Sequence, residues 1–233
     1  MRPDDRQAEF DCLADTYHEQ HKANVAITGE EPAYFAAYKI ADLAALLAHA
    51  SPAAILDFGS GIGNSLPYFR KHFPHAALTC ADVSARSITL AKERFPGPER
   101  YVQIGKGVPL PDASQDVVFS ACVFHHIPHE EHAHWLAELR RVTRPGGLLA
   151  IFEHNPLNPL TVRAVNTCPL DVNARLIRGA TMRSRAEAAG WQSARIDYRL
   201  FFPAALAGLR FLEPGLGWLC LGAQYRLTVR RPA

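Results

Sequence analysis

The sequence lacks the features that are typical of secreted proteins, fibrous proteins and proteins stabilised by a structural metal. Its five cysteines are an odd number, lie far apart and include no C-x-x-C pair, so we expect neither a disulfide framework nor a structural zinc site. It has no internal repeat or low-complexity tract, and 48% hydrophobic with 21% charged residues is ordinary for a globular chain. The 233 residues therefore predict one sizeable domain in a reducing, cytoplasmic setting.

Membrane-directing segments are also scarce. The first ten residues, MRPDDRQAEF, are polar and acidic, which argues against a signal peptide. The apolar stretch 200–221 has nearly the length of a membrane span, but Arg210 and Glu213 lie near its centre and two prolines interrupt it. We expect a buried helix there, with an interfacial helix that contacts a membrane as the alternative.

Neither sign of charge is in large excess, because the net charge is +2, but the charges are unevenly distributed. Residues 1–50 hold nine acidic and four basic side chains, whereas residues 140–233 hold fourteen arginines and five acids. The arginines form no dense run and have no interleaved aromatics, which argues against a nucleic-acid partner. An anionic small molecule remains open as the partner.

Short aliphatic runs alternate with helical patterns along most of the chain. Strands are expected at 53–58, 77–84, 101–106, 116–124, 148–154, 193–202 and 222–231. Helices are expected at 33–49, 65–73, 85–95, 129–143 and 184–191. The alternation predicts an α/β fold: a doubly wound, mostly parallel, seven-stranded Rossmann-like sheet with an antiparallel last strand and helices on both faces. Ligands of such sheets bind beyond the carboxyl ends of the strands.

A glycine-rich turn follows the first expected strand, in the stretch ILDFGSGIGNS at 55–65. Glycines between a strand and a helix are typical of a loop that lets a nucleotide-like ligand approach the backbone. A dinucleotide-binding loop would have a glycine where Asn64 stands, and a phosphate-binding loop would have a lysine that is missing here. The spacing disfavours a dehydrogenase.

Two acids near this turn indicate what the loop holds. Asp57 stands two residues before Gly59, where a buried carboxylate repels a pyrophosphate and attracts an ammonium group. Asp82 ends the second expected strand, where dinucleotide folds place an acid that binds ribose hydroxyls. The implied ligand is a nucleoside with a cationic tail. Helix or turn capping is the structural alternative for both acids.

Four motifs together resemble the class I S-adenosylmethionine-dependent methyltransferase family. ILDFGSGIGNS resembles its first motif, D/E-x-G-x-G-x-G, and ADVSARSITLAKERF resembles its second strand and the following helix. PLPDASQDVVFSACVFHHI resembles its fourth-strand region, and ELRRVTRPGGLLAIFEH resembles its turn into the fifth strand. The resemblance covers residues 36–155 and implies a methyltransferase that uses S-adenosyl-L-methionine and releases S-adenosyl-L-homocysteine.

By this resemblance, ten residues are expected to contact the cofactor: Tyr17, Asp57, Gly59, Ser60, Gly61, Gly63, Asp82, Val83, Ala121 and Cys122. Asp57 is expected beside the methionine end, and Asp82 at the ribose diol. FDCLADTYHEQH, at 10–21, resembles the opening of many such enzymes, so Tyr17 is expected to close over the cofactor. Gly105-Lys106 departs from the Gly-Asp that often contacts the adenine, so adenine recognition must use other groups.

The same resemblance suggests how the chain is divided. Residues 1–35 are expected to cap the cofactor site, and 36–233 to form the methyltransferase domain. Within that domain, 155–183 is a proline- and asparagine-rich insertion, long enough for a substrate cap, with a plain structural connection as the alternative. Arginines at three positions in it would suit an anionic acceptor: Arg163, Arg175 and Arg178.

Histidines follow the fourth and fifth strands, on the expected ligand side of the sheet. Catalytic candidates are His125, His126 and His154, with Glu153 and Asn155 beside them, because an ordinary histidine pKa near 6.5 suits a general base. Packing is the alternative role, especially for His126. The string HHIPHEEHAHW invites a metal site, but without a second cluster we expect His129, Glu130 and His132 on a solvated helix face and no bound metal.

The favoured function is methylation of a small-molecule hydroxyl in a biosynthetic intermediate. The alternatives are an N- or C-methyltransferase acting on a lipid-linked acceptor at a membrane, and a non-catalytic module that binds the cofactor. The acceptor and the oligomeric state are not specified by the sequence.

Overall fold

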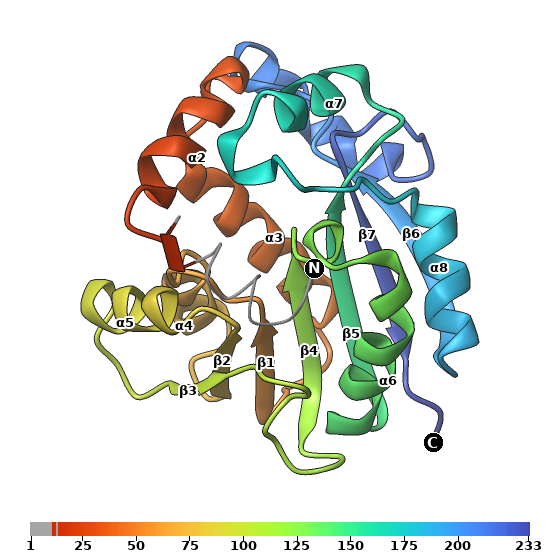
Figure 1. The fold of residues 1–233 in the computed structure, drawn as a ribbon. Coiled ribbons are helices and arrows are strands. Elements are labelled where there is room, and N and C mark those ends of the chain that lie inside the picture. The colour runs from red at the N-terminus through yellow and green to blue at the C-terminus, as the bar shows by residue number, and fades with distance from the viewer. Residues whose placement is uncertain (1–10, 13) are drawn as a thin grey trace.

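The computed structural model describes residues 11–12 and 14–233 of the chain. Seven strands form one sheet in the order β3-β2-β1-β4-β5-β7-β6, and β7 alone runs antiparallel to its neighbours (Figure 1). The strands are β1 (Ala54–Phe58), β2 (Ala77–Asp82), β3 (Arg100–Gln103), β4 (Gln115–Ala121), β5 (Thr143–His154), β6 (Gln192–Arg199) and β7 (Gln224–Arg230). The predicted fold class, strand number and antiparallel last strand are confirmed.

The first strand, β1, lies inside the sheet and is apolar on both sides because both faces are covered. Its residue Ile55 packs into one buried cluster and Leu56 into the other. Asp57 follows in register with Cys80 of β2 and Phe119 of β4. This central strand therefore carries a carboxylate to the carboxyl edge of the sheet, where ligands of such folds bind.

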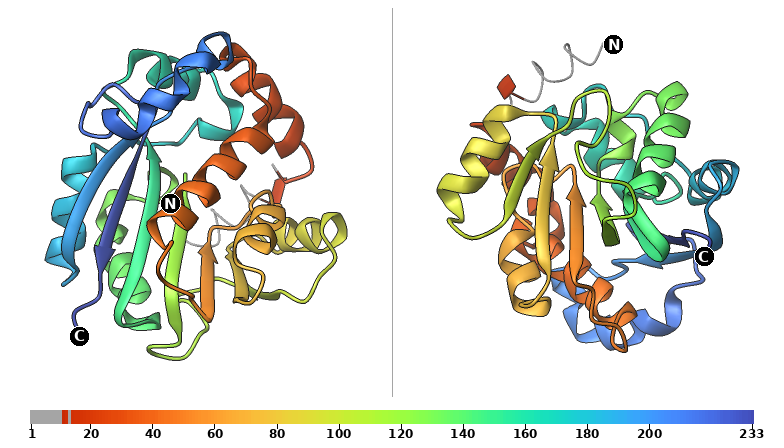
Figure 2. Two further views of the ribbon diagram at one scale, coloured as in Figure 1. Left: turned by 180° about the vertical axis from the view of Figure 1, so that it is seen from behind. Right: turned by 90° about the horizontal axis from the view of Figure 1, so that it is seen from below.

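Helices cover both faces of the sheet, as the view from below shows (Figure 2). The helices are α2 (Tyr17–Val25), α3 (Pro32–Leu46), α4 (Leu66–His72), α5 (Ala85–Arg94), α6 (His132–Val142), α7 (Pro159–Asn166) and α8 (Gly179–Ala188). The helix expected at 184–191 begins earlier, at Gly179, and the one expected at 129–143 opens with a 3-10 turn at His129–Glu131. The sequence did not predict α2 or α7, which lie at the carboxyl end of the sheet (Figure 1).

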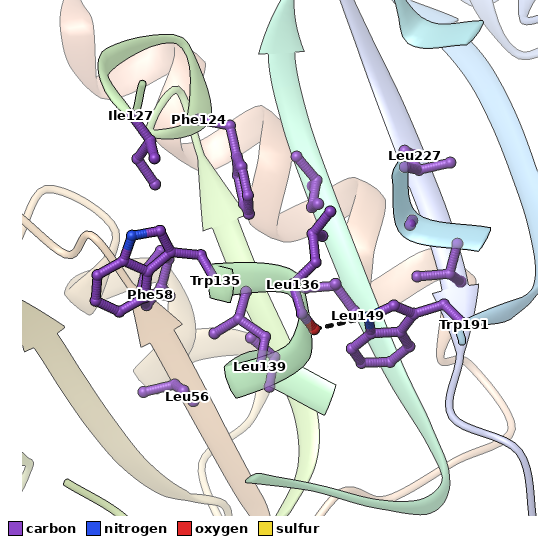
Figure 3. Close-up of a cluster of buried hydrophobic side chains, with 14 of the residues drawn as sticks. Leu56, Phe58, Phe124, Ile127, Trp135, Leu136, Leu139, Leu149, Trp191 and Leu227 are labelled. Atoms are coloured by element: carbon purple, nitrogen blue, oxygen red, sulfur yellow. Dashed lines mark hydrogen bonds between the residues drawn. The ribbon is translucent and has the colours of Figure 1, made fainter. Parts of the chain in front are cut away.

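One face of the sheet packs against α6 and α8. Trp135 and Leu136 of α6 lie over β1 and β4, and Trp191 packs beside them next to β5 and β7 (Figure 3). The Trp191 indole N–H donates to the Leu136 carbonyl oxygen at 3.0 Å, so this buried ring keeps its hydrogen bond. The opposite face is covered by α3 and α4, which contribute Ile40, Leu43 and Phe69 among others.

Residues 200–221 depart from the expected buried helix. They contain a 3-10 run, η5 (Ala204–Leu216), whose one buried residue is Glu213, while Phe211 and Trp218 are 76% and 78% exposed. The Glu213 carboxylate accepts the backbone N–H groups of Phe201 and Phe202 at 3.0 and 3.1 Å. The segment is anchored by a polar side chain, whereas six of its large apolar side chains are exposed. Within residues 11–12 and 14–233, no helix combines the length and apolar character needed to cross a bilayer.

Candidate functional site

The glycine loop joins β1 to α4 and has the geometry of a ligand cradle. The N–H groups of Gly59 and Ser60 donate to the Ala81 carbonyl at 2.8 and 3.0 Å, which fixes the loop against β2. Gly59 has φ +77°, and a Cβ there would lie 2.3 Å from the Val123 side chain, so only glycine fits. At Gly61, φ is +51° and a Cβ would meet nothing within 4 Å, so open space lies beside the loop.

Asp57 lies at the mouth of this loop with an unsatisfied charge. The residue is 3% exposed, and neither its Oδ2 nor the buried Ser60 hydroxyl has a hydrogen-bond partner among the described residues. Burial and then the nearby Asp82 raise the pKa of Asp57 to about 7, against the opposing effect of Lys39. A buried carboxylate oxygen without a donor suits a cationic group of a ligand.

Asp82 connects the glycine loop to the start of α5. Its Oδ2 accepts the Gly61 N–H at 2.7 Å and its Oδ1 accepts the Ser84 N–H at 2.9 Å. Ser84 caps α5 by accepting the Ser87 N–H, and its hydroxyl donates to Asp11. Burial raises the pKa of Asp82, although these backbone bonds oppose the shift. The capping alternative therefore describes part of what Asp82 does, and each oxygen retains a lone pair for a second donor.

Cys122 directly follows β4 and has an unusual backbone conformation and an unusual neighbour. Its φ is +57°, a conformation that non-glycine residues seldom adopt, and Lys39 Nζ donates to its Sγ at 3.4 Å. Burial alone raises the pKa of the Cys122 thiol, but the charges of His154 and Lys39 and a hydrogen bond with His154 lower it to about 6. Ala121 precedes it as the last residue of β4.

Lys39 is a site residue that the sequence reasoning missed. It is 8% exposed and lies on the buried side of α3 with Ala36, Ile40 and Leu43. This spacing is the signal that could have revealed it, because a lysine at a core position of an apolar helix is rarely buried without a partner.

The three predicted histidines come together at the carboxyl ends of β4 and β5. The ring centroids of His125 and His126 lie 4.1 Å apart, and those of His125 and His154 lie 5.1 Å apart. The His125 ring is buried, with Nδ1 2.6 Å from a Glu153 oxygen and Nε2 3.5 Å from an Asp171 oxygen. Glu153 also accepts the N–H groups of Val123 and Phe124.

The same surroundings give these groups very different pKa values. Burial alone lowers the pKa of His125, but the carboxylates of Glu153 and Asp171 raise it to about 10. Burial and the adjacent His125 lower the pKa of His126 to about 3. Although burial alone raises the pKa of Asp171, His125 lowers it to about 2. Asp171, from the turn η4 (Pro169–Asp171), is the second residue that the sequence reasoning missed.

In the string HHIPHEEHAHW, the position of His132 differs from the one that the sequence predicts. His132 is fully buried, so its expected place on a solvated helix face is wrong. Its Nε2–H donates to the carbonyl oxygens of Phe124 and Ile127 at 3.1 and 3.0 Å, and its Nδ1 lies 2.7 Å from Arg185 Nη1. With both nitrogens engaged, His132 holds the loop that carries His125 and His126.

Tyr17 and Val83 border this region from the other side. The pKa of Tyr17 is raised, first by burial and then by the neighbouring Cys122 and Asp171 groups. Val83 follows Asp82, and its carbonyl oxygen accepts from Gln103. A cavity of about 360 Å³ opens beside the histidines; it is lined by His125, His126, Ile127, Pro128, Glu130, Val172, Asn173, Ala174 and Arg175.

Known proteins resemble this chain in sequence. A family described as a methyltransferase domain matches residues 56–151. The trans-aconitate 2-methyltransferase of Methylobacterium nodulans is 32% identical over 73% of this chain and 69% of its own length. The malonyl-[acyl-carrier protein] O-methyltransferase of Methylococcus capsulatus is 30% identical over 78% of this chain and 66% of its own length. Other matches are shorter: the chain spans 42% of the trans-aconitate 2-methyltransferase of Rhodopseudomonas palustris.

The fold agrees. A structure of an S-adenosylmethionine-dependent methyltransferase from Archaeoglobus fulgidus superposes with a TM-score of 0.68 at 14% identity, covering 86% of this chain and 95% of that one. The chain belongs to the class I S-adenosylmethionine-dependent methyltransferases. It is an enzyme that transfers the methyl group of S-adenosylmethionine to a small molecule.

The residues present fit this cofactor. Asp57 Oδ2 and the Ser60 hydroxyl are buried polar atoms that still need partners, and the space beside Gly61 would be filled by a side chain at that position. An α-ammonium group, a carboxylate and a ribose diol would supply the missing partners.

Proposed function

We propose that this enzyme methylates the hydroxyl oxygen of a small molecule and that His154 takes the hydroxyl proton. The observation that carries the proposal is the histidine cluster at the ends of β4 and β5, in which the partly exposed His154 lies beside Cys122. S-adenosylmethionine supplies an activated methyl group on a sulfonium, so the protein must hold the acceptor in line and remove its proton. A relative with O-methyltransferase in its name supports transfer to oxygen.

Different residues around the glycine loop would bind different parts of the cofactor. Asp57 would accept from the α-ammonium group, and Lys39 would move from Cys122 to the α-carboxylate. The Asp82 oxygens would accept from the ribose hydroxyls while keeping their bonds to the loop. The remaining predicted contacts would supply backbone groups or walls of the same cleft: Gly59, Ser60, Gly61, Gly63, Val83, Ala121 and Cys122.

Two of the three histidines are poorly suited to take a proton. His125 already carries one, because two carboxylates raise its pKa to about 10. His126 binds protons weakly, with its pKa lowered to about 3 by burial and by His125. His154 is therefore the base, and His125 with Glu153 and Asp171 is the charged frame that positions it.

The two predicted caps would close the site. Helix α2 carries Tyr17, which would close over the cofactor if residues 1–35 act as a cofactor cap. The insertion 155–183 supplies Asp171 and one wall of the cavity, in keeping with a substrate cap. The exposed Arg175 would then meet an anionic part of the acceptor at the cavity rim.

A panel of phenols, sugars and carboxylic acids, incubated with methyl-labelled cofactor, tests the proposal. We expect label in a methyl ether, a His154→Gln variant with kcat lower by about 10²- to 10⁴-fold, and cofactor affinity unchanged. The exposed His75→Gln is the matched control. Label on nitrogen or carbon, an ester product insensitive to His154→Gln, or binding without turnover on every acceptor would each refute the hydroxyl assignment.

A lipid-linked acceptor is the second candidate, favoured by the outward apolar side chains of 200–221. Leu206, Leu209, Phe211, Leu212, Trp218 and Leu221 are between 40% and 78% exposed. If they dock on a bilayer, the chain will co-sediment with liposomes and a Phe211→Asp/Trp218→Asp double variant will not. An Ala137→Asp variant on the exposed side of α6 is the control. Equal sedimentation of wild type and double variant would remove this candidate.

A further inference from the structure

Three ligand atoms from two distant parts of the chain converge at the cavity. His125 Nε2, His126 Nε2 and an Asp171 carboxylate oxygen all lie within 4.8 Å of one another. We propose that these residues bind a divalent transition-metal ion such as Zn²⁺ or Co²⁺. Two imidazoles and one carboxylate form a donor set that borderline metals of this kind prefer.

The spacing fits a metal better than a direct contact. The Asp171 oxygen is 3.5 Å from His125 Nε2 and 3.4 Å from His126 Nε2, both longer than a good N–H···O hydrogen bond. Ligand atoms placed tetrahedrally at about 2.1 Å from an ion lie about 3.4 Å apart. The two distances from Asp171 therefore match the separation of neighbouring ligand atoms around one ion.

The hydrogen bonds around the proposed ligand His125 resemble those found around metal-bound histidines in proteins. Metal-bound histidines usually donate their other ring N–H to a carboxylate, which fixes the ring. Here His125 Nδ1 lies 2.6 Å from Glu153, whose second oxygen is held by the N–H groups of Val123 and Phe124. Ion binding would displace the proton on His125 Nε2, and the ion would take over the role of that proton between His125 and Asp171.

The site is open on one side, because His125 and His126 also line the 360 Å³ cavity. The fourth position would face that space and accept an oxygen ligand. Resting on the proposed function, this ligand is the acceptor hydroxyl: the ion makes its proton more acidic, His154 takes that proton, and the oxygen receives the methyl group as the sulfonium becomes a thioether.

Cobalt binding tests the site independently of methyl transfer. Protein dialysed against EDTA and titrated with Co²⁺ is expected to bind one ion per chain, with visible absorption of a low-coordinate site and competition by Zn²⁺. Asp171→Asn and His126→Gln should each weaken binding by about 100-fold or more, and Glu153→Gln by about 10- to 100-fold. His129→Gln, in the same loop but outside the cluster, should bind as wild type does.

Two results would overturn the site: no saturable Co²⁺ binding, or binding that Asp171→Asn leaves unchanged. Eleven histidines in the chain make the second outcome the informative one, because adventitious binding would ignore Asp171. The methyl-transfer assay in the presence of EDTA separates the two proposals. Transfer to a hydroxyl without any metal binding would retain the proposed function and refute the metal site.

Discussion

Lys39 of α3 donates a hydrogen bond to the Cys122 thiol at the end of β4, across 3.4 Å. This pair links α3 to the end of β4, where we propose that the methyl group is transferred. With His154 it makes Cys122 more acidic than an ordinary thiol, although burial acts against it.

Alkylation of Cys122 measures that effect. We expect its rate in the cofactor-free enzyme to rise with a midpoint near pH 6, the value to which His154 and Lys39 lower the pKa against burial. Lys39→Met should shift the midpoint upward and also weaken cofactor binding, whereas Lys71→Met on the exposed side of α4 should do neither. Peptide mass spectrometry separates Cys122 from the other four free cysteines. An unchanged midpoint in Lys39→Met would contradict the pairing.

Asp57→Asn is expected to abolish cofactor binding and to stabilise the empty protein. Burial raises the folded-state pKa of Asp57 to about 7, above its ordinary value of 3.8. Between these values the folded chain keeps a proton that the unfolded chain has released, so wild-type stability falls as pH rises through this window. In Asp57→Asn that fall should be smaller, and Tm at pH 8 should increase by several degrees. Thermal unfolding from pH 4 to 8 and calorimetry with the cofactor check both points.

Gly61→Val should separate ligand binding from folding. A Cβ at Gly61 meets no atom within 4 Å, so the side chain would occupy the space of the cofactor at a backbone cost of about 1–2 kcal/mol for the positive φ. Circular dichroism should remain that of the wild type while cofactor binding is lost. Gly59→Val, which would clash with Val123, should instead reduce the folded fraction. Retained binding in Gly61→Val would place the cofactor elsewhere.

Glu213→Ala should destabilise the chain although it lies in an exposed apolar segment. Glu213 is buried and accepts two backbone N–H groups and the Tyr38 hydroxyl, so its loss should lower the free energy of unfolding by about 2–3 kcal/mol. Glu187→Ala breaks an exposed pair with Arg183 and should cost less than about 1 kcal/mol. Urea denaturation of the two variants gives the comparison, and equal midpoints would show that the segment is not anchored there.

The sheet was predictable because its central strands are mostly buried on both faces and are therefore largely apolar. Asp57 and Asp82 could be placed at the carboxyl edge by the same logic, since each ends such a strand. The stretch 200–221 was predicted wrongly because its hydrophobic residues suggested burial, whereas two prolines and the anchoring of Glu213 leave the chain in exposed 3-10 turns. Composition does not tell which side of such a segment faces the protein.

Residues that reach the site from a distance were harder to foresee. Asp171 sits in a short turn of the insertion, where no periodic pattern fixes its direction, and its contact with His125 depends on the path of the whole loop. Helix α7, which precedes that turn, is started by Asn158, whose side chain accepts the N–H groups of Leu160 and Thr161. That capping pattern was readable, but the apolar and proline content of the stretch concealed it.

The contact between Arg185 and His132 connects the histidine loop to a residue of helix α8. Arg185 belongs to α8, on the far side of α6 from the cleft, yet through His132 it reaches the two carbonyl groups on either side of His125 and His126. A change on that outer helix can therefore retune the reaction centre without altering any group that meets cofactor or acceptor. Variants selected for altered acceptor choice should be sought on α8 as well as along the walls of the cavity.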